Sequence, residues 1–157
     1  MIIYIGADHR GFELKEYLKN ILKIKGYEVA DAGAVSPNEN DDFNEFAEKV
    51  AKKVSEDYEH AKGILICGSG VGMDIIANKF PKVRSALVFN ADQAYDSRND
   101  DDVNVLSLAA DHIKPEDAKN IVITWLGTPF SGEERFKRRL ERIVKLEQKN
   151  FHPLDEE

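Results

Sequence analysis

The sequence has very little cysteine and no excess of positive charge, and each of these features excludes some classes of protein. A single cysteine among 157 residues excludes a disulfide within the chain. The formal net charge of −7 disfavours a surface for nucleic acid or anionic membranes, because affinity for phosphate backbones comes mainly from clustered Lys and Arg. No apolar run approaches the ~18 residues of a membrane span, and no charged-then-apolar leader opens the chain. We therefore expect a cytoplasmic protein that binds neither nucleic acid nor membrane.

Short apolar runs alternate with amphipathic stretches, which predicts one domain over residues 1–149 and a C-terminal tail at 150–157. The expected strands are Met1–Ile5, Tyr27–Asp31, Ile64–Cys67, Arg84–Phe89 and Val103–Leu108. The expected helices cover about residues 12–25, 42–58, 71–79, 91–98, 115–127 and 132–149. An apolar stripe on the second helix is expected in the core: Phe43, Phe46, Ala47, Val50, Ala51, Val54 and Tyr58. Parallel neighbours require crossover connections, so this order favours an α/β fold, a five-stranded parallel sheet with helices on both faces.

The chain is organised around the stretch from Gly63 to Asp74, which reads as a buried strand, a glycine-rich loop and the start of a helix. The loop contains three alternating glycines, Gly68, Gly70 and Gly72. Such a loop suits an anion, because its backbone N–H groups can face a ligand and the helix adds positive potential. Cys67 is either a small buried residue or a thiol activated as base or nucleophile. Ser69 either orients a substrate hydroxyl or forms a turn.

Several other polar residues are expected near the same site, because ligands of parallel sheets bind beyond the carboxyl ends of the strands. Asp8 and His9 follow the first strand, and Asp42 lies beyond the second. His9 is either a base or anion contact, or a structural capping residue. Asn104 stands at the start of the last strand, so its own loop would have to bring it near the site.

The last helix carries the one basic cluster of an acidic chain. Its apolar seam is Phe136, Leu140, Ile143 and Val144, and its basic residues are Arg135, Lys137, Arg138, Arg139 and Arg142. The basic side chains either form a solvated face or include a clamp. In the second case Arg135 and Arg139, one helical turn apart, bind a phosphate or carboxylate within one chain or across a dimer interface.

Two other ligand classes are disfavoured. The three consecutive acids Asp100, Asp101 and Asp102 lack companion ligands at metal-like spacing, so we expect no metal site. The glycines read G-x-G-x-G after the third strand, not G-x-G-x-x-G after the first, which argues against a dinucleotide. Two hypotheses remain open: an enzyme that uses Cys67 on a small anionic substrate, or a module that only binds such an anion.

Several motifs together resemble the ribose-5-phosphate isomerase type B family, which includes the galactose-6-phosphate isomerase subunits. The motifs are Gly6–Lys15, Gly63–Gly72, Ala77–Lys79, Ser97–Arg98 and Asn104–Leu106. The resemblance covers about residues 1–149. It implies a Rossmann-like three-layer fold and a cofactor-independent aldose–ketose isomerase of sugar phosphates, in carbohydrate metabolism of the pentose phosphate type. It also implies a homodimer, or a dimer of dimers, whose C-terminal helix packs on the partner and whose sites use both chains.

The same resemblance assigns roles to individual residues. Cys67 matches the base that moves a proton between C1 and C2, and the loop residues Gly68, Ser69, Gly70 and Gly72 match the cradle of the enediolate anion. Asp8 matches a substrate-hydroxyl contact. Asn104 matches a further substrate-binding residue. The phosphate contacts, partly from the partner chain, match His9, Arg135 and Arg139.

Four positions depart from the family pattern. Asp100 stands where the family has the histidine that opens the sugar ring, and Asp101 replaces its asparagine neighbour. Phe43 replaces a tyrosine and Phe136 a histidine. Because an aspartate is almost wholly ionised at neutral pH, we expect Asp100 to be a poor acid for ring opening. These changes leave the isomerisation base in place and predict an altered or already open-chain substrate.

Overall fold

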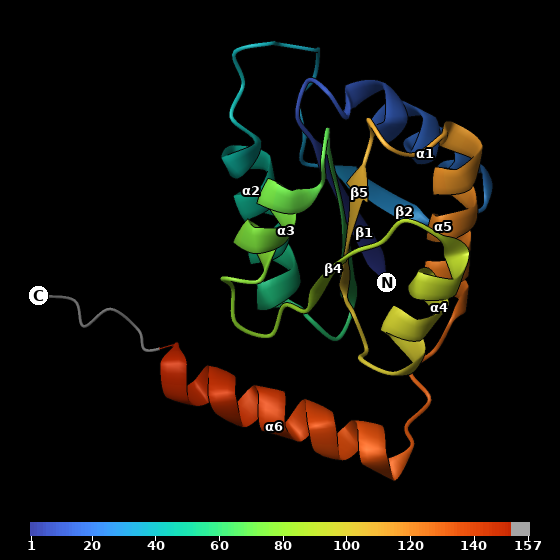
Figure 1. Ribbon diagram of the computed structural model, residues 1–157. Helices are drawn as coiled ribbons and strands as arrows, with labels where there is room; N and C mark the ends of the chain where they lie inside the picture. The colour runs from blue at the N-terminus through green and yellow to red at the C-terminus, as the bar shows by residue number, and fades with distance from the viewer. Residues whose placement is uncertain (152–157) are drawn as a thin grey trace, which may run out of the picture.

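Five parallel strands form the centre of the molecule, in the order β2-β1-β3-β5-β4 (Figure 1). The computed structural model describes residues 1–151. The strands are β1 (Ile2–Ala7), β2 (Glu28–Asp31), β3 (Ala61–Cys67), β4 (Ser85–Leu87) and β5 (Val105–Ala109). The register pairs Ile5 of β1 with Ile64 of β3, and Ile64 with Leu106 of β5. The predicted parallel sheet is confirmed.

Helices cover both faces of this sheet. They are α1 (Phe12–Ile24), α2 (Phe43–Glu56), α3 (Val71–Ala77), α4 (Ala91–Asn99), α5 (Pro115–Gly127) and α6 (Glu134–Asn150). Side chains alternate along a strand, so Ile64 and Ile66 of β3 pack in one core with residues of α1, α4 and α5. Leu65 and Cys67 point the other way, into a core with α2 and α3. The side chain of Cys67 therefore faces the α2–α3 layer.

Some element boundaries and core positions differ from the sequence prediction. Strand β1 continues to Ala7, since it pairs with β3 as far as Ile66. The edge strand β4 is shorter than expected, since its pairing with β5 covers only Ser85–Leu87. The predicted apolar stripe of α2 is buried only in its middle: Phe43 and Tyr58 are 36% and 42% exposed, and Tyr58 lies beyond the helix end. Both residues were wrongly placed in the core.

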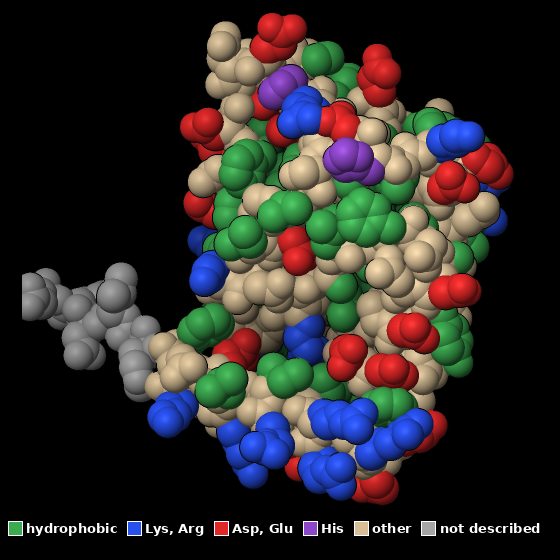
Figure 2. Space-filling model, viewed as in Figure 1, with side chains coloured by type: hydrophobic (Ala, Val, Ile, Leu, Met, Phe, Trp, Pro, Cys, Tyr) green, Lys and Arg blue, Asp and Glu red, His purple; other side chains and the backbone are tan. Residues whose placement is uncertain are grey.

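Helix α6 crosses the amino ends of the strands, separate from the two helical layers (Figure 1). Its Phe136 is buried, but Ile143, Val144 and Leu146 remain exposed. Figure 2 shows Lys and Arg side chains gathered over this helix. A groove of about 450 Å³ runs between α6 and the segment around β4. The predicted tail lies mostly outside the described residues, and no described helix is long and apolar enough to cross a membrane.

Candidate active site

Cys67 ends β3 at the carboxyl edge of the sheet and is 5% exposed. Its Sγ accepts a hydrogen bond from the backbone N–H of Gly70 at 3.1 Å. The chain can return toward the sulfur in this way because Gly70 has φ 74°, the left-handed conformation that glycine adopts without strain. This contact fixes the sulfur at the end of β3, beside the glycine loop.

The rest of the glycine loop is used in two different ways. Ser69 is exposed, and its Oγ accepts the Val71 N–H at 3.3 Å, so its own proton remains free for a ligand. Gly72 lies against the ring of Phe43, where a Cβ would come within 2.6 Å of a ring carbon. The absence of a side chain at Gly72 therefore admits Phe43, the residue that stands in place of the family tyrosine.

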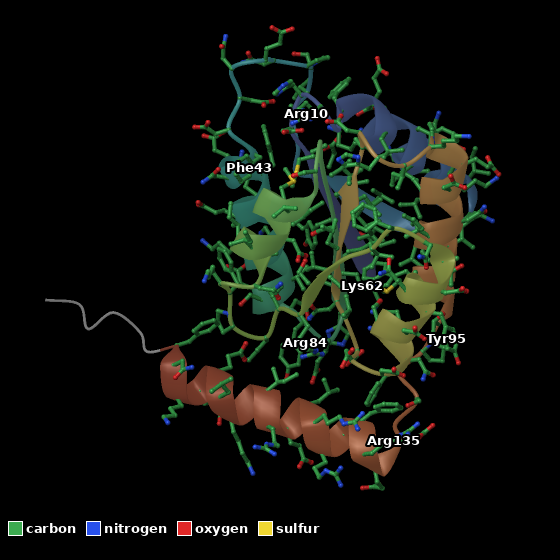
Figure 3. All side chains as sticks on the ribbon, viewed as in Figure 1. Arg10, Phe43, Lys62, Arg84, Tyr95 and Arg135 are labelled. Atoms are coloured by element: carbon green, nitrogen blue, oxygen red, sulfur yellow. The ribbon has the colours of Figure 1, made fainter. Side chains whose placement is uncertain are left out.

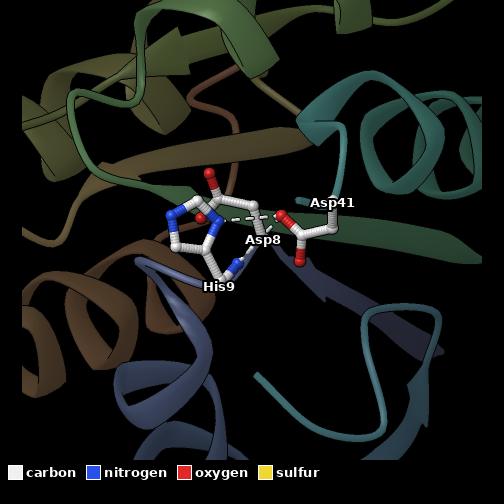
Figure 4. A group of neighbouring side chains, drawn as sticks. All are labelled: Asp8, His9 and Asp41. Carbon is white, nitrogen blue, oxygen red and sulfur yellow. Dashed lines mark hydrogen bonds and ion pairs between the residues drawn. The ribbon is translucent and has the colours of Figure 1, made fainter. Parts of the chain in front are cut away.

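Asp8 and His9 lie beside this loop, at the end of β1, together with Asp41 (Figure 4). Asp8 is buried, and its Oδ1 accepts the N–H groups of Arg10 and Gly11, both at 3.0 Å. Asp41 Oδ1 accepts the backbone N–H of His9 at 3.3 Å and lies 2.9 Å from Nδ1 of the ring. The sequence pointed to Asp42, whereas the structure brings Asp41 to His9. Adjacent identical residues gave no signal that could separate them.

Within residues 1–151, these three could also hold a metal, since one ligand atom from each lies within 4.8 Å of the others. However, Asp41 Oδ1 already forms a hydrogen bond with the His9 ring, and Asp8 Oδ1 already accepts hydrogen bonds from two backbone N–H groups. The same contacts fix the imidazole of His9 and cap the turn before α1. The arrangement is explained without an ion.

Asn104 lies at the opposite edge of the sheet. It directly precedes β5, while Cys67 pairs with Ala109 at the far end of that strand. Asn104 and Ala109 are five residues apart at ~3.3 Å each, so Asn104 lies about 16 Å from the level of Cys67 along the strand. The amide of Asn104 accepts the Arg84 N–H at 2.8 Å and donates to the Lys82 carbonyl at 2.8 Å. The expectation that the loop carries Asn104 to the site is wrong within one chain.

The three consecutive acids at this amino edge have three different surroundings. Asp102 binds Arg84 and Arg98 at 3.0 and 2.7 Å, so it is a structural ion-pair partner. Asp100 is the C-cap residue of α4, and its Oδ1 accepts a hydrogen bond from the side-chain amide of Asn99 at 2.8 Å. Burial raises the pKa of Asp101 above its ordinary value, and the charge of Asp100 adds to this rise.

Arg135 and Arg139 of α6 lie near these acids. Their guanidinium carbons lie 4.5 and 5.5 Å from the centre of the Phe136 ring, and both side chains are exposed. The Ser131 N–H donates to the Asn99 carbonyl at 3.1 Å, which ties the segment before α6 to the end of α4. The positive charge of Arg139 is close enough to oppose the rise in the pKa of Asp101.

The expected site residues thus form two groups. Figure 3 places Arg10 and Phe43 near one end of the molecule and Arg84 and Arg135 near the other. The carboxyl-edge group contains Asp8, His9, Cys67, Gly68, Ser69, Gly70 and Gly72. The amino-edge group contains Asp100, Asn104, Arg135 and Arg139. One chain does not bring the two groups together.

Comparison with known proteins gives the family. A family model described as Ribose/Galactose Isomerase matches residues 3–143. This chain belongs to that family. It is 40% identical over 147 residues to ribose-5-phosphate isomerase B of Escherichia coli, covering 94% of this chain and 97% of that protein. It is 38% identical over 145 residues to a probable ribose-5-phosphate isomerase B of Mycoplasma genitalium, covering 92% and 95%.

Solved structures of family members have the same fold. Ribose-5-phosphate isomerase B of Mycoplasma genitalium, with bound ribulose-5-phosphate, superposes with a TM-score of 0.92 at 37% identity, over 95% of this chain and 97% of that one. The protein from Clostridium thermocellum gives 0.90 at 40% identity, over 96% and 100%. The family and the Rossmann-like architecture inferred from the motifs are therefore confirmed.

Proposed function

We propose that the protein is a cofactor-independent aldose–ketose isomerase of a sugar phosphate. The observation that carries the proposal is the buried Cys67 Sγ, which receives the Gly70 N–H at the end of β3 in a chain of this family. As a thiolate, Cys67 takes the proton from C2 of the aldose and leaves an enediolate. The Cys67 thiol then gives this proton to C1, while a hydroxyl proton passes from the oxygen on C2 to the oxygen on C1.

The glycine loop supplies what this intermediate needs. Preorganised N–H groups that face a developing anion lower its energy without reorganisation. Ser69 keeps a free hydroxyl proton beside the loop, which suits it to bind an oxygen of the substrate. Asp8 has its Oδ1 taken by two N–H groups, and its second carboxylate oxygen is the atom we assign to a sugar hydroxyl.

The phosphate end of the substrate requires positive charge, and Arg10 at the carboxyl edge is already paired with Asp111. We assign the phosphate to His9 of one chain and to Arg135 and Arg139 of a second copy. Two features support a homodimer with such composite sites: both arginines are exposed, and they lie at the edge opposite Cys67. The exposed apolar residues of α6, Ile143, Val144 and Leu146, are suited to packing on that copy.

The relatives named above are ribose-5-phosphate isomerases, which makes ribose 5-phosphate the first candidate substrate. Asp100 favours a related pentose or hexose phosphate, or one that reaches the site with its ring already open. A reduced thiol base suits the cytoplasm. The alternative is a sugar-phosphate-binding protein without turnover, and the substitutions at Asp100, Phe43 and Phe136 are what favour it.

The test is Cys67→Ser, assayed by deuterium wash-in at C2 over a panel of pentose and hexose phosphates. Loss of a positioned base costs roughly 10²–10⁴-fold, so exchange should fall by that factor while the folded state and sugar-phosphate affinity persist. Undiminished exchange in the variant would refute the role of Cys67. A wild-type protein that binds these sugar phosphates but exchanges none of them would establish the binding-protein alternative.

A further inference from the structure

Arg10 crosses the carboxyl edge of the sheet directly over the glycine loop. It follows β1, and its guanidinium forms an ion pair with Asp111, which follows β5. Strand β3 lies between β1 and β5, so the pair passes over Gly68, the first residue after that strand.

The guanidinium lies flat against Gly68. A Cβ at Gly68 would overlap the guanidinium carbon and nitrogens of Arg10, so only glycine admits this contact. The carbonyl of Gly68 accepts the Asp111 N–H at 3.0 Å, and the carbonyl of Cys67 accepts the Ala110 N–H at 2.9 Å. Gly68 is therefore held by the side chain of Arg10, which follows β1, and by the backbone that follows β5.

The ion pair is poorly placed to stabilise the fold. The side chains of Arg10 and Asp111 are 53% and 38% exposed, and pairs this exposed contribute little to the free energy of unfolding. Its position has a larger consequence. Gly68 lies between Cys67 and Gly70, whose N–H donates to the Cys67 sulfur, so a shift of Gly68 displaces both the proposed base and the loop beside it.

We propose that Arg10 and Asp111 are positioning residues: their ion pair is a strap that holds Gly68, and through it the Cys67–Gly70 loop, in the geometry of reaction. This inference rests on the proposed isomerase function. The strap acts on the loop and not on the substrate, so breaking it lowers kcat and leaves KM nearly unchanged.

Three variants break the strap by different routes: Arg10→Gln removes the charge, Asp111→Ala removes its partner, and Gly68→Ala pushes the guanidinium off the loop. Misplacement of a reacting group by about 1 Å can cost ~10²-fold, so each variant should lower kcat roughly 10- to 100-fold. The Arg10→Gln/Asp111→Ala double variant should be no slower than either single variant, because both remove one contact. Lys119→Gln is the matched control, since it breaks the exposed Lys119–Glu116 pair within α5.

Hydrogen exchange at the Gly68 and Gly70 amides gives a readout that does not depend on turnover. It should quicken in Arg10→Gln and Asp111→Ala, with unfolding temperatures unchanged, and stay constant in Lys119→Gln. If Arg10→Gln keeps its wild-type kcat and exchange rates, there is no strap. If Arg10→Gln loses activity while Asp111→Ala keeps it, Arg10 acts on the substrate and the strap is also refuted. A wild-type protein without isomerase activity refutes the proposed function instead, and the exchange rates still decide the strap.

Discussion

Lys15 is a lysine of α1 whose side chain is completely buried. Its Nζ donates to Asp31 Oδ2 at 2.9 Å and to the Ala34 carbonyl at 2.6 Å, which anchors the loop that leads to Asp41. Burial by itself would raise the pKa of Asp31, but hydrogen bonds from Lys19, Lys15 and the Gly33 N–H outweigh it and lower the pKa below the ordinary 3.8. One carboxylate thus supports the loop that positions His9.

Replacing Asp31 by Asn should lower the free energy of unfolding by about 2 kcal/mol at neutral pH, because the buried charge of Lys15 then keeps only Glu16, at 3.5 Å, as a charged partner. A lowered pKa stabilises the protein above the ordinary value, and this contribution is lost as the pH falls through the folded-state pKa. The difference in free energy of unfolding between wild type and Asp31→Asn should therefore become smaller below about pH 4. Urea unfolding at pH 7 and pH 3 measures this difference, with Glu56→Gln as control, since Glu56 is exposed and pairs with Lys52 of α2. An equal gap at both pH values would contradict the explanation.

Asp100 is the residue at which we expect the substrate to depart from ribose 5-phosphate. Aspartate is in general a much poorer proton donor to a ring oxygen at neutral pH than histidine is. The wild type should therefore act slowly on ribose 5-phosphate, and Asp100→His should be at least roughly 10-fold faster. Asp92→His, an exposed change in the first turn of the same helix, is the control. A wild-type rate in the ordinary range of order 1–10³ s⁻¹ would show that another group or water opens the ring.

At the scale of elements, the turn between β1 and α1 packs directly on β3. A Cβ at Gly11 would overlap the carbonyl group and the side chain of Ile66. The φ of Gly11 is −95°, which any residue adopts, so close packing and not backbone strain requires glycine there. This contact sets the Asp8–His9 turn beside the residue that precedes Cys67.

Gly11→Ala should therefore destabilise the protein by about 2–3 kcal/mol, as overpacking of a rigid contact does. Gly127→Ala is the matched control: Gly127 ends α5, and an added methyl group would meet nothing within 4 Å. It should be neutral or stabilising by about 0.5 kcal/mol, because alanine favours helix. Thermal unfolding of both variants is the measurement. Equal unfolding temperatures would mean that the β3 contact relaxes at little cost.

At the scale of the whole molecule, the two groups of site residues predict complementation between chains. A Cys67→Ser chain and an Arg139→Ala chain, each poorly active alone, should together form heterodimers with one site that has both residues intact. Activity of the mixture should exceed that of either parent. Cys67→Ser mixed with His9→Ala should show no such gain, because both residues lie on the same edge of one chain. If neither mixture gains activity although dimers form, the site is built within one subunit.

Local sequence patterns determined the strand and helix order, the parallel sheet and the cysteine–glycine loop, because hydrophobic period and glycine spacing act over a few residues. The family motifs were equally readable. Tertiary structure alone decided that Asp41 and not Asp42 meets His9, and that Asn104 lies on the edge opposite Cys67. It also decided that Arg10 lies over Gly68. These outcomes depend on contacts between segments far apart in the chain, whose direction and distance are set by strand register and by packing of the layers.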